Sequence, residues 1–209
     1  MERRSEDLSY ECENSVIRNR IFLIGFNKCA TTTFHEFCLS NNLRSLHWKA
    51  RSGEYLAVKL LQNHALGRNA LQGLEKNTAY CDITYNDGSI CIEGCRFFRY
   101  IHRSYPDGYF ILNTRPVEHW IRSRMNHADG DFLRRALASS GFDTATLKKA
   151  WNYVYQKHHQ EVRAYFSKNP RFLEFDIEAD RPEKICDFLS NNFSLDPGKW
   201  GHENRTRRH

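Results

Sequence analysis

Short apolar runs alternate along the chain with segments in which apolar residues recur every three or four positions. Short runs that stop at turn-forming residues are typical of buried strands, and the three-to-four spacing is typical of helices. The expected strands cover residues 21–25, 44–47, 78–83, 109–113 and 172–175. The expected helices cover residues 31–39, 53–66, 94–104, 116–125, 144–166 and 182–189. This alternation predicts an α/β fold, in which a mainly parallel sheet is flanked by helices on both faces.

The sequence shows no internal repeat, low-complexity stretch or Pro/Gly-rich linker that would divide the chain. A length of 209 residues suits one domain of ordinary size. Because residues 1–18 are polar, we expect them to form a flexible N-terminal arm. Residues 19–209 are expected to form a single α/β domain.

Composition narrows the class of protein only slightly. Hydrophobic residues make up 40% of the chain and aromatic residues 13%, which favours a globular protein over a disordered one. The formal net charge of +6 suits an anionic ligand. Much of that excess comes from arginines in the two tails, namely Arg3, Arg4, Arg205, Arg207 and Arg208. Composition is therefore compatible with anion binding and equally with a charged, soluble surface.

Seven cysteines are scattered along the chain without a C-x-x-C pair, which favours free thiols in a reducing compartment over a zinc site. The charged N-terminus lacks the apolar core of a signal peptide. No run of about 18 apolar residues is present for a membrane span. We therefore expect a cytoplasmic protein that has no membrane partner.

The strongest candidate for chemistry is the loop Gly25–Thr33, between the first expected strand and the first expected helix. Such a turn presents backbone N–H groups and a helix N-terminus at one point, which favours phosphate binding. The predicted binding residues are Asn27, Lys28, Cys29, Ala30, Thr31, Thr32 and Thr33. The alternative is that the threonines only cap the helix and that Lys28 is a solvated loop charge.

The loop differs from the nucleoside-triphosphate loop G-x-x-x-x-G-K-[ST]. Ala30 stands where the second Gly would be, and Thr31 takes the place of the Lys. The lysine of this loop, Lys28, lies three positions earlier. This displacement argues against Mg²⁺-assisted ATP chemistry.

The run Lys28-Cys29-Ala30-Thr31-Thr32 resembles the K-x-G-T-T loop of sulfotransferases that use 3′-phosphoadenosine 5′-phosphosulfate (PAPS). In that family the loop grips the 5′-phosphosulfate of the donor. Ala30 replaces the usual Gly, which is tolerable at a negative φ and strained at a positive one. The family also holds the donor's 3′-phosphate with an Arg at a strand end and a Ser eight residues later. Arg115 and Ser123 match that pair, although Arg115 by itself could form a structural ion pair.

Smaller similarities extend the resemblance over residues 21–204. They are the segments 105–107, 120–124, 172–177 and 200–204. The resemblance implies a three-layer, P-loop-like fold. It also implies transfer of a sulfuryl group from PAPS to a hydroxyl or amine, with release of 3′-phosphoadenosine 5′-phosphate (PAP). The acceptor would be a small molecule or a carbohydrate, no metal is expected, and nucleic acid is not an expected partner.

By the same resemblance, Lys28 would neutralise the charge that develops on the leaving 5′-phosphate. A general base would remove the acceptor proton, and the family uses a His or a carboxylate for this. His47 and Asp82 are the best candidates, because each ends an expected strand at the edge where sites form. Glu93 and His127 are further candidates. Each of these residues could instead be an ordinary surface or structural polar group.

Three other functions remain open. A P-loop kinase of a nucleotide or small metabolite would share the fold and require Mg²⁺. A basic nucleic-acid-binding module would use the arginines and aromatic residues, but no binding motif of that kind is recognisable. A non-catalytic relative would bind the nucleotide without transferring a group. The acceptor pocket is expected within residues 48–100 and 126–160.

Overall fold

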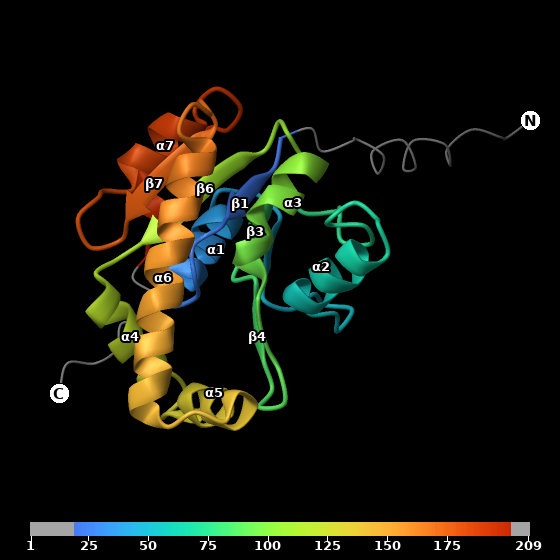
Figure 1. The fold of residues 1–209 in the computed structure, drawn as a ribbon. Coiled ribbons are helices and arrows are strands. Elements are labelled where there is room, and N and C mark those ends of the chain that lie inside the picture. The colour runs from blue at the N-terminus through green and yellow to red at the C-terminus, as the bar shows by residue number, and fades with distance from the viewer. Residues whose placement is uncertain (1–18, 202–209) are drawn as a thin grey trace, which may run out of the picture.

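The computed structural model describes residues 19–201 and shows a five-stranded sheet at the centre of the fold (Figure 1). The order of the strands is β2 (Ser45–His47), β3 (Ala79–Cys81), β1 (Ile21–Leu23), β6 (Tyr109–Thr114) and β7 (Phe172–Asp176). Every pairing between these strands is parallel. The predicted α/β class and the parallel sheet are therefore confirmed. The predicted arm at residues 1–18 and the similarity at residues 202–204 lie outside the described residues.

Helices cover both faces of the sheet because side chains on a strand alternate between its two faces. Ile21 and Leu23 of β1 pack on one face with α1 (Thr31–Ser40) and α7 (Glu183–Leu189). Phe22 and Ile24 pack on the other face. The helices on that face are α2 (Leu56–Ala65), α3 (Phe98–Ser104) and α6 (Thr144–Phe166). The result is a three-layer arrangement of helix, sheet and helix (Figure 1).

A third apolar cluster lies beyond the carboxyl ends of the strands. It joins Phe26 of the first loop to α4 (Val117–Met125), α5 (Asp131–Ser140) and the first half of α6. Trp120 and Trp151 are among its buried members. This cluster supports the edge of the sheet where the candidate loop lies. Within residues 19–201, no helix has the length and apolar character needed to cross a membrane.

Two features of this region were not predicted. A hairpin of β4 (Thr84–Asn86) and β5 (Cys91–Glu93) projects from the sheet toward α5 (Figure 1). Each strand has three residues of mixed polarity, so neither forms the apolar run that marks β1 in the sequence. Helix α5 is the second feature that was not predicted. Its sequence does carry a helical signal, because Phe132 and Ala136, which are both buried, lie four residues apart. The expected helix 94–104 also begins as a 3₁₀ turn, Gly94–Phe97, before α3.

The topology brings the loops after β1, β2, β3 and β6 to one edge. From β1 the chain crosses to β2 on one side of the sheet, whereas from β6 it continues to β7 on the other side. In open α/β sheets, ligands bind outside the carboxyl ends of strands where the chain changes direction in this way. The candidate loop Gly25–Thr33 follows β1 and precedes α1 at this point.

Candidate functional site

Asn113, on β6, clamps the two ends of the candidate loop. Its side-chain oxygen accepts a hydrogen bond from the Gly25 amide at 2.9 Å, and its amide nitrogen donates to the Cys29 carbonyl at 2.8 Å. A Cβ atom at Gly25 would lie 2.0 Å from the Asn113 carbonyl oxygen. Gly25 is therefore required because the two backbones approach closely, and the loop has one position relative to the sheet.

A second support reaches the loop from α4. The Asn27 carbonyl accepts a hydrogen bond from Trp120 Nε1 at 2.9 Å, and the Asn27 side chain accepts one from Arg124 Nε at 2.8 Å. Arg124 is buried, with its guanidinium 4.3 to 5.5 Å from the ring centroids of four aromatic side chains. It also pairs with Glu93 at 2.7 Å. The predicted binding residue Asn27 therefore anchors the loop to α4. Glu93, one of the further base candidates, forms an ion pair with Arg124, the residue that holds the Asn27 side chain.

The backbone of the loop is strained at two positions. Lys28 has a φ of 66° and Ala30 a φ of 58°, both in the left-handed region. This conformation costs a residue other than glycine about 1–2 kcal/mol. Ala30 therefore occupies the conformation for which glycine is better suited. Strain of this kind is often retained at functional sites, where the surrounding structure enforces it.

Ala30 is also the N-cap residue, directly before the first residue of α1, and no side-chain hydrogen bond caps this helix. The first turn of an α-helix carries N–H groups that have no partner within the helix. Together with the helix dipole, these groups favour an anion at this end. The loop thus provides backbone donors, the Thr31 and Thr32 hydroxyls and the Lys28 ammonium at one point.

Lys28 is half-buried above the loop. Burial lowers the pKa of its ammonium; Asp82 raises this pKa, whereas Arg115 lowers it. The ammonium donates a hydrogen bond to Nδ1 of His127 at 3.0 Å. Burial and the Lys28 charge lower the pKa of His127, which keeps that ring neutral and able to accept this bond. An anion that binds at Lys28 would replace this weak neutral partner with an opposite charge.

The two preferred base candidates, His47 and Asp82, lie together beside the loop. His47 Nε2 is 3.7 Å from Asp82 Oδ2 and 3.3 Å from the Thr31 hydroxyl. The Thr32 hydroxyl is 3.5 Å from the same nitrogen, and the Thr31 hydroxyl donates to Asp82 Oδ2 at 3.4 Å. These long contacts form a loose cluster of two hydroxyls, an imidazole and a carboxylate.

The surroundings of this pair shift both pKa values toward neutral forms. Burial lowers the pKa of His47 to about 4, and the Lys28 cation contributes to the lowering. Burial raises the pKa of Asp82 to about 6, against the lowering effect of a hydrogen bond from Thr84. Asp82 also has a φ of 52°, so strain recurs at the end of β3. At pH 7 the His47 ring is therefore neutral.

Arg115 lies at the end of β6, next to the loop. Its Nη1 donates to the Lys28 carbonyl at 3.1 Å, and its Nε donates to Glu178 at 2.8 Å. Its Nη2 contacts the same carboxylate, whose other oxygen is 2.7 Å from Nδ1 of His119. The structure thus brings Arg115 to the loop, and it also pairs Arg115 with a carboxylate of the chain itself.

Three predicted residues remain: Ser123, Cys29 and Thr33. Ser123 lies half-buried on α4, and among the described residues no hydrogen bond joins its hydroxyl to Arg115. Cys29 is fully buried, and burial raises the pKa of its thiol to about 12, so only its backbone can face a ligand. The Thr33 side chain is also buried. The structure therefore gathers Lys28, Thr31 and Thr32 with the base candidates, and leaves Ser123 and the Cys29 side chain at the margin.

Sequence reasoning missed several residues that build this site. Asn113 carries the loop, Arg124 supports it, and Glu178 pairs with Arg115. Tyr155 of α6 fixes the Arg115 backbone, since its hydroxyl accepts from the Arg115 amide at 3.1 Å and donates to the Arg115 carbonyl at 2.6 Å. Of these, only Asn113 carries a signal in the sequence, as an uncharged polar residue in a buried strand.

Two cavities of the described residues lie away from the cluster around His47. A cavity of about 10 Å³ lies beneath the loop, among Cys29, Ala30, Phe34 and Trp200. A larger concave surface of about 510 Å³ lies on α3 and α6. Within residues 19–201, no group of three or more His, Cys, Asp or Glu side chains is arranged to hold a metal ion.

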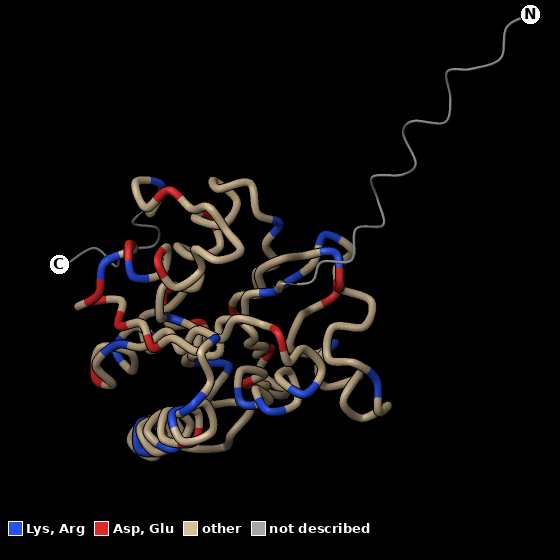
Figure 2. The backbone as a smooth tube through the Cα atoms, turned by 90° about the horizontal axis from the view of Figure 1, so that it is seen from above, with Lys and Arg blue, Asp and Glu red and all other residues tan. Residues whose placement is uncertain are grey.

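Charged residues of both signs are distributed over the described fold (Figure 2). Comparison of the chain with models of known protein families gives no match. Comparison with curated proteins gives no match either. The function must therefore be argued from the chemistry of the site.

Proposed function

We propose that this protein is a PAPS-dependent sulfotransferase, which transfers a sulfuryl group to a hydroxyl or amine and releases PAP. The observation that carries the proposal is the position of His47 and Asp82. They lie 3.3 to 3.5 Å from the hydroxyl groups of a loop that also offers a cation to a phosphate. Sulfuryl transfer needs these parts together: a cradle for the donor phosphate, a cation for the leaving oxygen and a base for the acceptor.

The donor would bind with its 5′-phosphosulfate against the loop. The N–H groups at the start of α1 and the hydroxyls of Thr31 and Thr32 suit its phosphate oxygens. The Lys28 ammonium would exchange His127 for this phosphate. Asn113 and Arg124 would keep the backbone of the loop in position during binding.

The 3′-phosphate would bind at Arg115. This residue contacts the Lys28 carbonyl, so the two phosphate positions would lie on either side of the loop. Glu178 occupies the guanidinium in the structure, and the 3′-phosphate would have to displace it. A doubly charged phosphate is a stronger partner for arginine than a single carboxylate, which favours the exchange. Ser123 would join this position only after a side-chain movement.

The transfer step would proceed by in-line attack. The acceptor oxygen forms a bond to sulfur while the bond from sulfur to the 5′-phosphate oxygen breaks, and that oxygen keeps the electron pair. His47 Nε2 takes the acceptor proton, and the nearby Asp82 carboxylate stabilises the imidazolium. The negative charge of the bound donor would raise the low pKa of His47 toward neutrality. Lys28 neutralises the charge on the leaving phosphate.

One observation favours a second function, that of a P-loop kinase. The Thr31 hydroxyl donates to Asp82 at 3.4 Å, and a loop hydroxyl beside a strand-end Asp is the pair that holds Mg²⁺ in P-loop NTPases. The positions of Lys28 and Thr31 weaken this alternative, because the loop lacks a lysine next to its final hydroxyl residue.

Thermal unfolding with nucleotides separates the two functions. PAP at about 100 times its dissociation constant should add about 2.7 kcal/mol to stability, whereas ADP, and ATP with Mg²⁺, should add less. Lys28→Met should remove most of this gain, and Lys148→Met, at an exposed position of α6, should leave it unchanged. Stabilisation by ATP with Mg²⁺ but not by PAP would support the kinase. Stabilisation by neither would contradict both.

A further inference from the structure

A strained turn follows His47 directly. The Lys49 amide donates to the His47 carbonyl at 2.6 Å, and Trp48 between them has a φ of 59°. A three-residue turn with a positive central φ is the rare, strained form of γ-turn. For a bulky aromatic residue this conformation is a genuine outlier, and such strain tends to persist where it serves a site. The turn leaves the Trp48 side chain 44% exposed.

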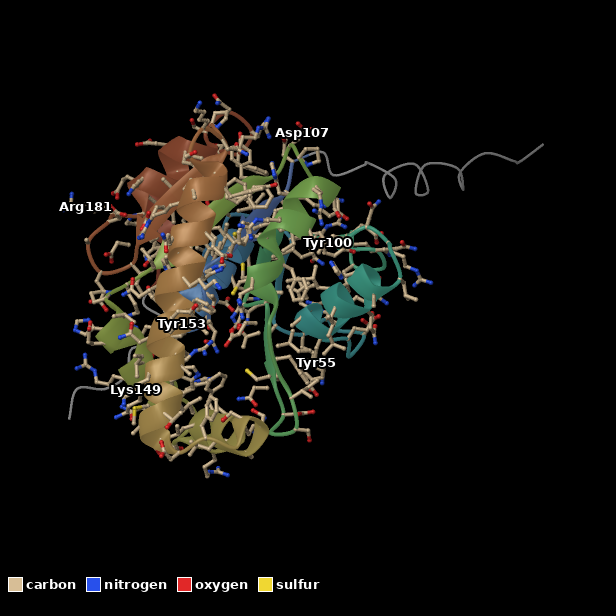
Figure 3. All side chains as sticks on the ribbon, viewed as in Figure 1. Tyr55, Tyr100, Asp107, Lys149, Tyr153 and Arg181 are labelled. Carbon is tan, nitrogen blue, oxygen red and sulfur yellow. The ribbon has the colours of Figure 1, made fainter. Side chains whose placement is uncertain are left out.

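Two tyrosines continue the ring of Trp48 into an aromatic surface formed by Trp48, Tyr55 and Tyr85. The ring centroids of Trp48 and Tyr55 are 5.1 Å apart, and those of Tyr55 and Tyr85 are 4.7 Å apart. The rings come from three separate segments: the turn after β2, the start of α2 and strand β4. Tyr55 lies beside α2 in Figure 3, next to the β4–β5 hairpin. The surface therefore adjoins the carboxyl edge of the sheet, where His47 and Asp82 lie.

A cation completes the aromatic surface. The Lys49 ammonium lies 4.7 Å from the centroid of the Tyr55 ring. Among residues 19–201, no carboxylate forms an ion pair with this ammonium. Glu54, next to Tyr55 in the sequence, pairs with Lys59 instead, and Asp87 accepts a hydrogen bond from the Tyr85 hydroxyl. An exposed aromatic ring and a cation without an acidic partner therefore stand next to the candidate base.

We propose that this aromatic surface binds the acceptor, and that the acceptor is a ring compound with a free hydroxyl and a negatively charged substituent. The flat face of the ring packs on Trp48, the negative group pairs with Lys49, and the hydroxyl reaches His47. Aromatic side chains bind the apolar faces of both aryl and sugar rings, so the shared chemistry is a ring that has an apolar face and carries an acid. The inference rests on the proposed function, since it names the acceptor class of that same site.

Matched pairs of probes test the requirement for charge. We would titrate 4-hydroxybenzoate against 4-hydroxybenzamide, and methyl glucuronide against methyl glucoside, by calorimetry with PAP present. In at least one pair the acid should bind about tenfold more tightly than its neutral partner, which corresponds to about 1.4 kcal/mol. The pair that shows the preference tells whether the ring is aryl or sugar.

Variants locate the binding. Lys49→Gln should abolish the preference for the acid, and Trp48→Ala should weaken the acid and neutral probes alike. Trp48→Phe keeps a ring and should retain binding, which separates loss of the ring from loss of the fold. Lys157→Gln is the control, because its ammonium lies 5.7 Å from the ring of Tyr153 on α6, away from this surface (Figure 3).

Three results would overturn the inference: equal affinity within both pairs, no binding in either pair, or a preference that survives Lys49→Gln. A PAP titration of the same samples keeps this outcome separate from the proposed function. If PAP binds and the acid preference is absent, the acceptor class is wrong and the donor assignment stands. If PAP fails to bind, the donor assignment is wrong, and titrations without nucleotide still show whether the surface prefers acids.

Discussion

The side chain of Asn113 bonds to the amide of Gly25 across 88 residues of sequence, and the backbones of the two residues lie too close for any side chain at Gly25. The same carboxamide donates a hydrogen bond to the Cys29 carbonyl, so one buried side chain holds the candidate loop at both Gly25 and Cys29. The position of the loop is thus determined by β6 as much as by its own sequence.

Asn113→Ala should destabilise the protein by about 1–3 kcal/mol, because it leaves the Gly25 amide and the Cys29 carbonyl buried without partners. Urea unfolding measures the loss. Asn126→Ala, at an exposed position after α4, should change stability by less than about 0.5 kcal/mol. Equal effects of the two variants would show that the clamp contributes nothing.

Ala30→Gly should relieve the left-handed strain at the start of α1. The gain is expected to be about 1 kcal/mol or less, since glycine also increases the entropy of the unfolded chain. Ala145→Gly, in the exposed first turn of α6, should instead lose up to about 1 kcal/mol. Thermal unfolding of the two variants tests the difference in sign. A loss at Ala30 as large as that at Ala145 would contradict the strained conformation.

Glu178→Gln should strengthen binding of PAP about fivefold, because the 3′-phosphate would no longer compete with a carboxylate for Arg115. Hydrogen bonds from His119 and Arg115 outweigh the effect of burial and hold the pKa of Glu178 below its ordinary value, so the competitor is charged at pH 7. AMP, which lacks the 3′-phosphate, should bind equally to both proteins. Calorimetry with PAP and AMP measures this, and Glu161→Gln is the control, since Glu161 pairs with Arg99. Weaker PAP binding by Glu178→Gln would mean that the carboxylate supports the site.

His47→Asn should slow the turnover of PAPS about 100-fold or more and leave PAP affinity unchanged. Hydrolysis of PAPS to PAP and sulfate, in which water takes the place of the acceptor, provides the assay. His64→Asn, at the exposed end of α2, is the matched control. A rate that is unaffected by His47→Asn but lost with Asp82→Asn would transfer the role of base to Asp82.

The strands of the central sheet and most helices could be predicted because they show local periodicity, whereas β4, β5 and α5 were missed. The loop could be found because it follows the first apolar strand. The position of His47 and Asp82 could be predicted for the same reason, since both end strands of one parallel sheet. The partners of the loop could not be predicted. Arg124 and Tyr155 lie on helices and act through contacts across 97 and 40 residues, for which no local pattern exists. The left-handed Ala30 also opposes local preference and is imposed by the surrounding structure.

Buried histidines should make the protein sensitive to acid. Burial lowers the pKa of His158 to about 3 and that of His159 to about 4, and His47 shifts likewise to about 4. His158 donates from Nε2 to the Ile24 carbonyl at 2.7 Å, which ties α6 to the end of β1. These rings stay neutral in the folded protein, whereas in the unfolded chain they gain protons as the pH falls through about 6.5.

The free energy of unfolding should therefore fall between pH 6.5 and pH 5, because the unfolded chain binds more protons than the folded one in this window. Asp82 has the opposite effect, since its pKa is raised to about 6 and the folded protein gains a proton there first. The buried histidines outnumber this carboxyl, so the free energy of unfolding should keep a positive slope with pH in this window. Urea unfolding at half-unit pH steps measures this slope. His158→Gln keeps a donor for the Ile24 carbonyl and removes one titrating group. The variant should therefore take up about one proton fewer on unfolding, and its free energy of unfolding should depend less steeply on pH. A stability that is constant or rises between pH 6.5 and pH 5 would show that these histidines are not held neutral by burial.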